Sequence, residues 1–595
     1  MKIFPRLPLA PVYLCFVAAI GISNSARAGN ATWDLNPSSG DWNTPANWTP
    51  TTVPNGTTDT ATFGMSNITN VSISADTTVD GITFTSGASS FTITGNGFFP
   101  VNFRGAGITN DSGITQRFIT PGFIQFSNNA TAGTKTVFTN RERNNQIWFR
   151  DNSTADHATI TNNGMTAAAS FSGGGVEFLE SSNAANSTIT NNGGAVSGDF
   201  VGGFTGFHAT STAGSATISN NGGLVDNASG GSTGFYDAST SGNALITNNG
   251  GAVSGAFGGL TLFDETANAG NATITNNGGT AAGAGGGVTK FFRRSTAASA
   301  TLLANDGTGG GEGGAILFLS QSTGGTSRIE LFGNGNLDVS FHGTASVPVG
   351  SVEGDGNIFL GARSLSVGTN NMSTTFSGVI QDGGVNGGTG GSLTKIGSGT
   401  LILAGTNTYT GKTNVNGGVL QVDGSVKSNV FLSRGGTLAG TGIVQANVSN
   451  YLNGTVRPGA DAPGRLTVNS YTQTSPGKLL IDIAGFNTGE FSVLDVLGSA
   501  TLGGLLDPVL QNGFVPTVGQ EFVFLEYASF SGSLFIHDRN IDGTMEHWDI
   551  SYEPGHALLS VAAGNVSIPD QASTLLLMTL SLLGLVSLKA NLRRS

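Results

Sequence analysis

Cysteine is almost missing from this chain of 595 residues. The one copy, Cys15, lies in an apolar N-terminal stretch that we expect to be removed on export. The exported protein would therefore contain no disulfide, no thiolate nucleophile and no cysteine ligand for a metal ion.

Charged side chains are also scarce, at 10% of the residues. Between residues 151 and 320 the only basic residues are Lys290, Arg293 and Arg294. A protein that binds nucleic acid needs a basic stripe to follow the phosphate backbone. We therefore exclude nucleic acid as a partner, and the net charge of -12 mainly favours solubility outside the cell.

Motifs for cofactors and metals are absent as well. The six histidines show no His-x-x-x-His spacing, and the glycine-rich segment 309–314 lacks the Lys and Ser/Thr of a phosphate-binding loop. Asp306 and Glu312 lie near these glycines without the repeated Gly-Gly-x-Gly-x-Asp of calcium-binding β-helices. We predict no catalytic residues, no cofactor and no metal site.

Glycine, with 93 copies, and small polar residues dominate the chain instead, and 36 phenylalanines supply apolar mass for a core. This mixture favours short strands joined by tight turns over long helices. A chain of this length exceeds what one compact core needs. The composition therefore predicts an elongated all-β repeat array.

A strand of the type Ala-Thr-Ile-Thr-Asn-Asn returns at a nearly constant interval along the middle of the chain. Its central apolar residues form one column, Ile160, Ile189, Ile218, Ile246, Ile274, Leu302 and Ile329. A phenylalanine column follows in register, Phe178, Phe207, Phe235, Phe263 and Phe291. A third column contains the asparagines at the turn, Asn163, Asn192, Asn221, Asn249, Asn277 and Asn305.

Such units bury their apolar side only when each stacks on its predecessor. We therefore predict a single-stranded right-handed parallel β-helix, because the repeat is well short of the roughly 40 residues of a β-propeller blade. No proline interrupts the ladder between Pro121 and Pro348. With about 28 residues per turn throughout, the rod would be roughly 85 Å long. Asn221→Leu should then destabilise the protein more than Asn227→Leu, which lies outside the asparagine column.

Both termini carry targeting patterns. Residues 1–28 combine Lys2 and Arg6, an apolar stretch and the cleavage pattern Ala26-Arg27-Ala28, which predicts a signal peptide. Residues 567–595 combine Ile568-Pro569-Asp570, an apolar run from Ala572 to Leu588 and a basic end. This pattern predicts a C-terminal transmembrane helix with its basic end in the cytoplasm.

The C-terminal segment resembles the PEP-CTERM family of bacterial sorting signals, in the variant that begins Val-Pro-Asp-Ser-Gly. The resemblance implies recognition by an exosortase-like enzyme near Pro569-Asp570. Ile568 replaces Val here, and Gln571-Ala572 stand where Ser and Gly would be. Cleavage of this segment and its retention in the membrane are both consistent with the pattern.

The sequence Ser392-Leu-Thr-Lys-Ile-Gly-Ser-Gly-Thr-Leu-Ile-Leu403, with Asn407-Thr-Tyr-Thr-Gly411 and Gly417-Gly-Val-Leu-Gln-Val422, resembles the autotransporter-associated β-strand repeat. The resemblance covers residues 391–424 and implies a passenger-type β-helix. The opening of the mature chain, with Trp33, Trp42 and Trp48, is similar to the start of the same proteins and suits a cap over the first turn. No series of strands suited to an outer-membrane barrel follows.

These patterns divide the chain into successive segments. We expect an aromatic-rich cap with the first turns at 29–150, the regular array at 151–345 and a passenger-like β-helix at 346–535. A C-terminal β cap or linker at 536–566 then precedes the sorting tail.

Carboxylates also form a column after the phenylalanines. In register lie Glu180, Ala209, Asp237, Glu265, Arg293 and Gln321, preceded by Leu179, His208, Tyr236, Asp264, Phe292 and Ser320. Stacked carboxylates about 5 Å apart can share a proton for acid catalysis or bind calcium. A solvated face, with Glu265 and Arg293 paired between turns, is the simpler interpretation.

The sequence therefore predicts an exported surface or extracellular-matrix protein of structural or adhesin type, associated with the membrane through its C-terminal segment. Its expected partners are the export machinery, an exosortase-like enzyme and envelope or matrix polysaccharide. The alternative is a carbohydrate-active β-helix, a polysaccharide lyase or hydrolase, that uses Glu180, Asp237, Asp264 or Glu265.

Overall fold

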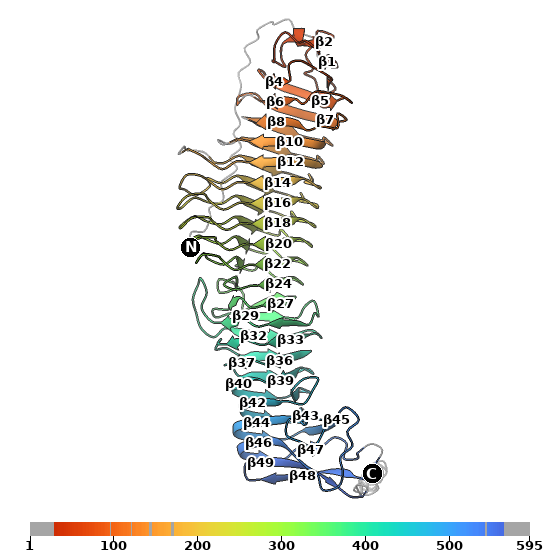
Figure 1. Cartoon of the computed structure of the whole chain (residues 1–595), viewed down its shortest axis with the longest axis vertical. Coiled ribbons are helices and arrows are strands. Elements are labelled where there is room, and N and C mark those ends of the chain that lie inside the picture. The colour runs from red at the N-terminus through yellow and green to blue at the C-terminus, as the bar shows by residue number, and fades with distance from the viewer. Residues whose placement is uncertain are drawn as a thin grey trace, which may run out of the picture.

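The chain forms an elongated, right-handed parallel β-helix of about 19 turns (Figure 1). The computed structural model describes residues 29–564, apart from 96, 121, 142–144, 168–171 and 542–543. The predicted signal peptide and sorting tail lie outside these residues. In the described part the one helix is a 3-10 turn, η1 (Pro45–Asn47).

Three sheets run along the rod. The first sheet contains, in chain order, β1 (Ala31–Trp33), β2 (Trp48–Thr49), β3 (Thr60–Phe63), β5 (Thr77–Phe84), β7 (Val101–Asn110), β9 (Phe123–Phe126), β11 (Gln146–Phe149), β13 (Gly175–Phe178), β15 (Phe204–Phe207), β17 (Ser232–Phe235), β19 (Leu260–Phe263), β21 (Val288–Phe291), β23 (Ala315–Phe318), β25 (Asn336–Asp338), β28 (Asn357–Phe359) and β31 (Val379–Gln381).

The second sheet contains β4 (Asn70–Ser72), β6 (Thr92–Thr94), β8 (Gln116–Thr120), β10 (Thr134–Asn140), β12 (His157–Asn162), β14 (Thr188–Asn191), β16 (Thr217–Asn220), β18 (Leu245–Asn248), β20 (Thr273–Asn276), β22 (Thr301–Ala304), β24 (Arg328–Leu331), β27 (Ser351–Gly354), β30 (Thr374–Phe376), β33 (Thr400–Leu403), β36 (Val419–Val422), β39 (Thr437–Gly440), β41 (Thr455–Pro458), β43 (Lys478–Ile483), β45 (Leu505–Leu510) and β47 (Phe535–Ile536).

The third sheet starts at residue 346 and contains β26 (Ser346–Val349), β29 (Ser364–Val367), β32 (Ser392–Lys395), β34 (Thr406–Asn407), β35 (Thr413–Val415), β37 (Ser425–Val426), β38 (Val430–Leu432), β40 (Ile443–Asn450), β42 (Arg465–Gln473), β44 (Val493–Leu502), β46 (Glu521–Gly532), β48 (His547–Glu553) and β49 (His556–Ala562).

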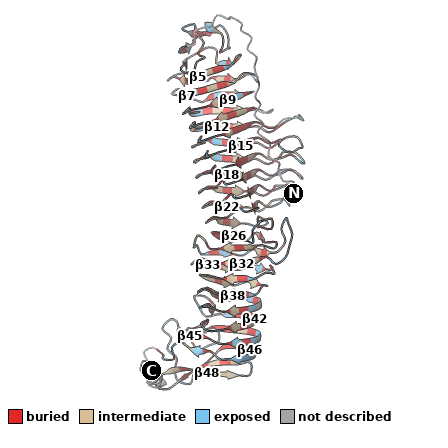
Figure 2. Cartoon of the chain, turned by 180° about the vertical axis from the view of Figure 1, so that it is seen from behind, coloured by how far each residue is buried: buried red, intermediate tan, exposed pale blue. Residues whose placement is uncertain are grey.

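The predicted apolar columns form the core between the first two sheets, and Figure 2 shows buried residues along the strands of the whole rod. Ile160, Ile189 and Ile218 pair directly across neighbouring strands and are fully buried. The phenylalanine stack is confirmed and longer than predicted, because it runs from Phe103 to Phe318. Its ring centroids lie 4.6–4.9 Å apart with interplanar angles of 5–11°.

Two asparagine ladders accompany this core, where the sequence predicted one. The predicted outer ladder is confirmed: each Nδ2 donates to the Oδ1 of the preceding turn at 2.9–3.1 Å, from Asn305 back to Asn163. An inner ladder of fully buried asparagines donates the opposite way, toward the following turn, at 2.6–2.8 Å. Its members are Asn140, Asn162, Asn191, Asn220, Asn248 and Asn276.

The inner amides are fully satisfied, as buried polar groups require. Asn220 donates to Asn248 Oδ1 at 2.8 Å and to the carbonyl of Leu260 at 3.2 Å. Its own Oδ1 accepts from Asn191 Nδ2 at 2.8 Å and from the Thr233 hydroxyl at 2.9 Å. The inner ladder therefore joins both sheets and successive turns in one network.

A lateral loop leaves each turn of the central array through a glycine neck that follows the outer asparagine. The N–H of Gly203 closes one neck by donating to the carbonyl of Asn192 at 2.7 Å. A Cβ on Gly193 would lie 2.0 Å from the carbonyl oxygen of Gly222, and one on Gly222 would lie 2.3 Å from that of Gly250. Only glycine permits such close stacking, which explains much of its abundance.

Turn length varies beyond residue 346. The turns from Leu401 to Val456 span 18 or 19 residues and lack the lateral loop, whereas the turn from Leu506 to Ile536 spans 30 residues. Leu401, Leu420 and Leu438 stack on successive strands of the second sheet and lie closer together in the sequence than Ile189 and Ile218 do. The predicted length of the rod rested on a uniform turn length, and the structure corrects that assumption. The same number of residues yields more turns between Leu401 and Val456 than in the central array.

Both described ends of the rod are capped. At the N-terminal end Trp33, Trp42 and Trp48 are buried around Phe63, with ring centroids 4.9–5.8 Å apart. At the C-terminal end the hairpin β48–β49 pairs antiparallel with β46. No helix among the described residues is long and apolar enough to cross a bilayer.

We expect Asn220→Leu to lower the free energy of unfolding by at least about 2 kcal/mol, because each buried partner left unpaired costs about 1–3 kcal/mol. Thermal or urea unfolding of the purified protein measures this. The matched control is Asn186→Leu, at an exposed position, with an expected cost under about 0.5 kcal/mol. Equal shifts for the two variants would show that the ladder contributes nothing. Asn227 is unsuitable as a reference, since its φ of 55° would strain leucine.

Candidate functional site

The predicted polar column lies at the corner that follows the phenylalanine stack. Glu180, Asp237, Glu265 and Arg293 all adopt left-handed backbone conformations there, with φ of 53–57°. The sequence prediction was wrong at the last position. Ser320, with φ of 56°, occupies the column in place of Gln321, because that turn is one residue shorter.

The carboxylates of this column bind backbone. Glu180 Oε2 accepts from the N–H of Asp151 at 3.0 Å, Asp237 Oδ2 from that of Ala209 at 2.8 Å, and Glu265 Oε2 from that of Asp237 at 3.0 Å. Each acidic side chain therefore caps the left-handed corner of the preceding turn. This structural use accounts for the recurrence of acidic residues at the column.

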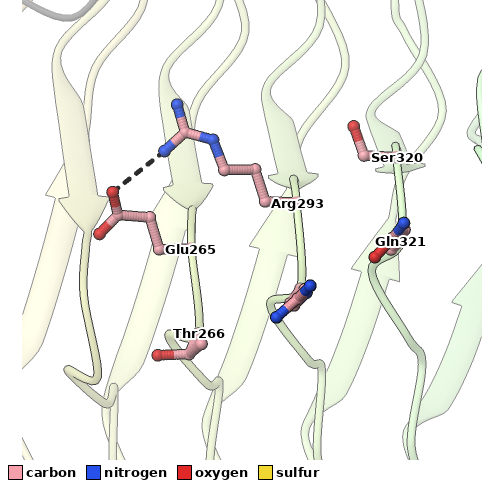
Figure 3. Close-up of a pocket in the computed structure, with 6 residues that line it drawn as sticks. Glu265, Thr266, Arg293, Ser320 and Gln321 are labelled. Carbon is pink, nitrogen blue, oxygen red and sulfur yellow. Dashed lines mark hydrogen bonds and ion pairs between the residues drawn. The ribbon is translucent and has the colours of Figure 1, made fainter.

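Asp264, Glu265 and Arg293 are brought together, as the sequence predicted for the last two. Arg293 Nη1 lies 3.1 Å from Glu265 Oε1 (Figure 3). It also lies 3.3 Å from Asp264 Oδ2. The guanidinium is 41% exposed, so the pairs stabilise the fold by under about 1 kcal/mol. The shallow hollow beside them, of about 440 Å³, is lined by Glu265, Thr266, Arg293, Arg294, Ser320 and Gln321.

A second polar group lies beside the column on the outer side of the first sheet. The sequence predicted that His208 and Tyr236 lie in register, but it did not predict their contact with Glu177. His208 Nε2 lies 3.0 Å from Glu177 Oε2, and its ring stacks on Tyr236 with centroids 4.9 Å apart. The sequence feature that could have revealed this group is the glycine at outward strand positions, which leaves room for the neighbouring side chains. A Cβ on Gly206 would lie 2.0 Å from Glu177 Oε2, and one on Gly234 would lie 2.6 Å from the Tyr236 ring.

The surrounding residues shift the pKa values of His208 and Tyr236. Burial alone would lower the pKa of His208, but the hydrogen bond and charge of Glu177 raise it overall. Burial, with the negative charges of Glu177 and Asp264, raises the pKa of Tyr236 to about 12. The phenol therefore stays protonated at neutral pH and cannot act as a base there.

This constellation lacks the geometry of an assembled active site. Glu180, Asp237 and Glu265 are engaged by backbone, and Asp264 accepts from the N–H of Glu265 at 2.6 Å. Within the described part of the chain, no group of three or more His, Cys, Asp or Glu side chains could hold a metal ion. The arrangement supports a ligand-contacting surface better than general acid catalysis.

The passenger-like segment builds two turns further along the rod. Leu401 and Leu403 of β33 point into the core as predicted, with Leu420 and Val422 of β36 stacked on them. Lys395, at the end of β32, is buried, and none of its described hydrogen bonds goes to a carboxylate. Its Nζ donates to the carbonyls of Ile396, Gly397 and Gly417 at 2.7, 3.4 and 3.5 Å.

Burial lowers the pKa of the Lys395 ammonium to about 8. The three carbonyls match the three N–H groups of an ammonium, so the side chain ties the turn at Ile396–Gly397 to the following turn. Gly418 has a φ of 60°, and a Cβ there would lie 2.4 Å from the carbonyl oxygen of Gly399 and 2.8 Å from Nζ, which explains the glycine. The Lys and Gly positions of the motif therefore form one structural unit.

This segment matches a known family of repeats. Residues 393–422 match the passenger-associated-transport-repeat family. The match confirms the predicted passenger-type repeat, and the parallel ladder on both sides of it confirms the β-helix.

Three curated relatives share parts of the chain. An extracellular serine protease of Serratia marcescens is 51% identical over 74 residues, which are 12% of this chain and 6% of the protease. The adhesin BmaC autotransporter of Brucella suis is 34% identical over 127 residues, 19% of this chain and 4% of the adhesin. The neisserial autotransporter lipoprotein NalP of Neisseria meningitidis is 30% identical over 224 residues, 36% of this chain and 18% of NalP.

This chain therefore spans less than a fifth of the length of these relatives. Among solved structures, the Haemophilus influenzae Hap adhesin matches 85% of this chain and 64% of its own, at 10% identity and a TM-score of 0.27.

We expect the free energy of unfolding to rise between pH 8 and 10 and Lys395→Met to reduce this rise. The pKa of Lys395 is lower in the folded state than the usual 10.5, so the unfolded state binds more protons in this window and stability increases with pH. Urea unfolding at several pH values measures the slope. Lys412→Met, at an exposed lysine, is the control and should keep it. An unchanged slope in Lys395→Met would contradict the assignment.

Proposed function

We propose that this chain is an exported surface or extracellular-matrix protein of structural or adhesin type. The observation that carries the proposal is the uninterrupted, capped β-helix with a passenger-type repeat in its wall. The partial match to an autotransporter adhesin supports the same assignment. A rod of this kind presents long faces away from the cell and needs no assembled catalytic centre.

Export and retention complete the proposal. Residues 1–28 direct secretion and are removed by the export machinery, and residues 567–595 hold the protein at the envelope. The tail is handed to an exosortase-like enzyme that recognises Ile568-Pro569-Asp570. Envelope or matrix polysaccharide is the proposed binding partner of the exposed rod. These steps rest on the sequence patterns described above.

The alternative function is a polysaccharide lyase or hydrolase. Incubation of the purified protein with a panel of acidic and neutral polysaccharides distinguishes the two, and we expect no new reducing ends or unsaturated products. The carboxylates that would act are engaged by backbone or by Arg293. Product formation that is lost in Asp264→Ala, but kept in the exposed control Asp226→Ala, would establish the enzyme and overturn the proposal.

We expect Leu580→Arg to release the protein from the envelope fraction. A charge near the centre of a short apolar segment costs roughly 2.5 to 3.5 kcal/mol of insertion free energy. Cell fractionation with immunoblotting measures the location. The matched control is Leu580→Ile, which should leave the protein where it was.

Replacement of Pro569-Asp570 by Ala-Ala separates sorting from simple anchoring. Under sorting, an uncut form accumulates in the inner membrane, whereas under anchoring neither mass nor location changes. If removal of residues 568–595 leaves the protein as firmly attached as before, the tail does not retain it.

A further inference from the structure

The outer face of the second sheet, from β12 to β22, carries two straight ranks of hydroxyl side chains. Each strand presents two outward residues, spaced two apart, on either side of the buried isoleucine column. The first rank is Thr159, Thr188, Thr217, Leu245, Thr273 and Thr301. The second rank is Thr161, Thr190, Ser219, Thr247, Thr275 and Leu303.

This face is regular and flat. The strands pair in register from β12 to β22 without a bulge. The phenylalanine rings of the core indicate the spacing and twist of the turns. Over the same turns their centroids lie 4.7–4.9 Å apart, and the planes of neighbouring rings differ by only 5–9°. Side chains therefore repeat at this interval along the rod and at roughly 6.7 Å across each strand.

None of these hydroxyls has a hydrogen-bond partner among the described side-chain contacts of the protein, and each residue of the two ranks is partly or fully exposed. The threonines inside the rod differ. Thr205, Thr233 and Thr261 each donate to the Oδ1 of a buried asparagine at 2.8–2.9 Å. The outward hydroxyls therefore remain available to a ligand.

The two ranks also contain no charged residue, although the chain as a whole has a net charge of -12. Charges border the face, with Arg117 on β8 and with Arg328 and Glu330 on β24. A surface of this kind complements an uncharged, periodic partner. Addition of a peptide strand is excluded, since both edges of every strand from β12 to β22 are already paired.

We propose that this face binds ice. The interval along the ranks is within a few tenths of an ångström of the oxygen repeat along one axis of hexagonal ice, and the interval across them is near the repeat along the other. Hydroxyls at these positions can replace lattice waters, while the threonine methyls and Leu245, which is 54% exposed, order water between them. The rigid ladders keep the array in place before contact, so little conformational entropy is lost on binding.

The experiment is slow growth of ice from a solution of the purified full-length protein, with immunoassay of the ice and liquid fractions and serum albumin as an excluded marker. We expect the protein to enter the ice. The double variant Thr190→Tyr/Thr247→Tyr should lose this partition and behave like albumin, because two bulky rings in mid-face prevent flat contact. Thr190→Val/Thr247→Val, which keeps the shape, should lose only part of it.

The matched control is Ser232→Tyr, on the outward side of the first sheet, which should partition like the parent protein. Melting curves verify that each variant is folded. Exclusion of the parent protein from ice overturns the proposal, and so does equal partition of the parent and the double Tyr variant. Adsorption to crystalline cellulose or chitin together with exclusion from ice would assign the face to a polysaccharide instead.

Discussion

Each turn of this rod depends on hydrogen bonding and close stacking with the turn before it. The backbone ladders supply the spacing, and the inner asparagine ladder adds a second set of bonds inside the core, where an unpaired amide would cost about 1–3 kcal/mol. Asn220 hydrogen-bonds with five groups on neighbouring strands, so its position is fixed by both sheets at once. Apolar stacking of the phenylalanines fills the remaining space.

The corners of the rod also depend on hydrogen bonds between successive turns. A left-handed residue at the end of each first-sheet strand turns the chain, and its N–H needs an acceptor that the regular ladder does not supply. Asp237 and Glu265 provide that acceptor from the following turn. The carboxylates of this column therefore stabilise the corners of the coil, and their hydrogen bonds to backbone N–H groups show this structural role. Lys395 has the corresponding role for the carbonyl groups of a later corner.

Rigidity also shapes what the surface can do. A rod held by ladders on every turn cannot close around a small substrate, but it can present long arrays of side chains in fixed positions. The threonine ranks of the second sheet and the Glu177–His208–Tyr236 group of the first sheet are two such arrays on different sides. This division suits a protein that makes its contacts along its length.

The sequence by itself determined the stacked columns of residues. The tertiary structure decided the length of individual turns and the directions of the side chains, which the repeat period does not specify. The regular recurrence of residues such as Ile160, Phe178 and Asn163 required stacked turns, because no isolated unit could bury its apolar residues. The motif at 392–422 predicted a passenger-type wall, and the early tryptophans predicted a cap. A turn one residue shorter moved Ser320 into the polar column in place of Gln321, and the short turns between Leu401 and Val456 changed the length of the rod. The second asparagine of each Asn-Asn pair was predicted to stack, but only the fold showed that Asn162, one residue earlier, faces inward. Contacts such as Glu177 with His208 depend on side-chain directions across neighbouring turns, which sequence spacing does not specify.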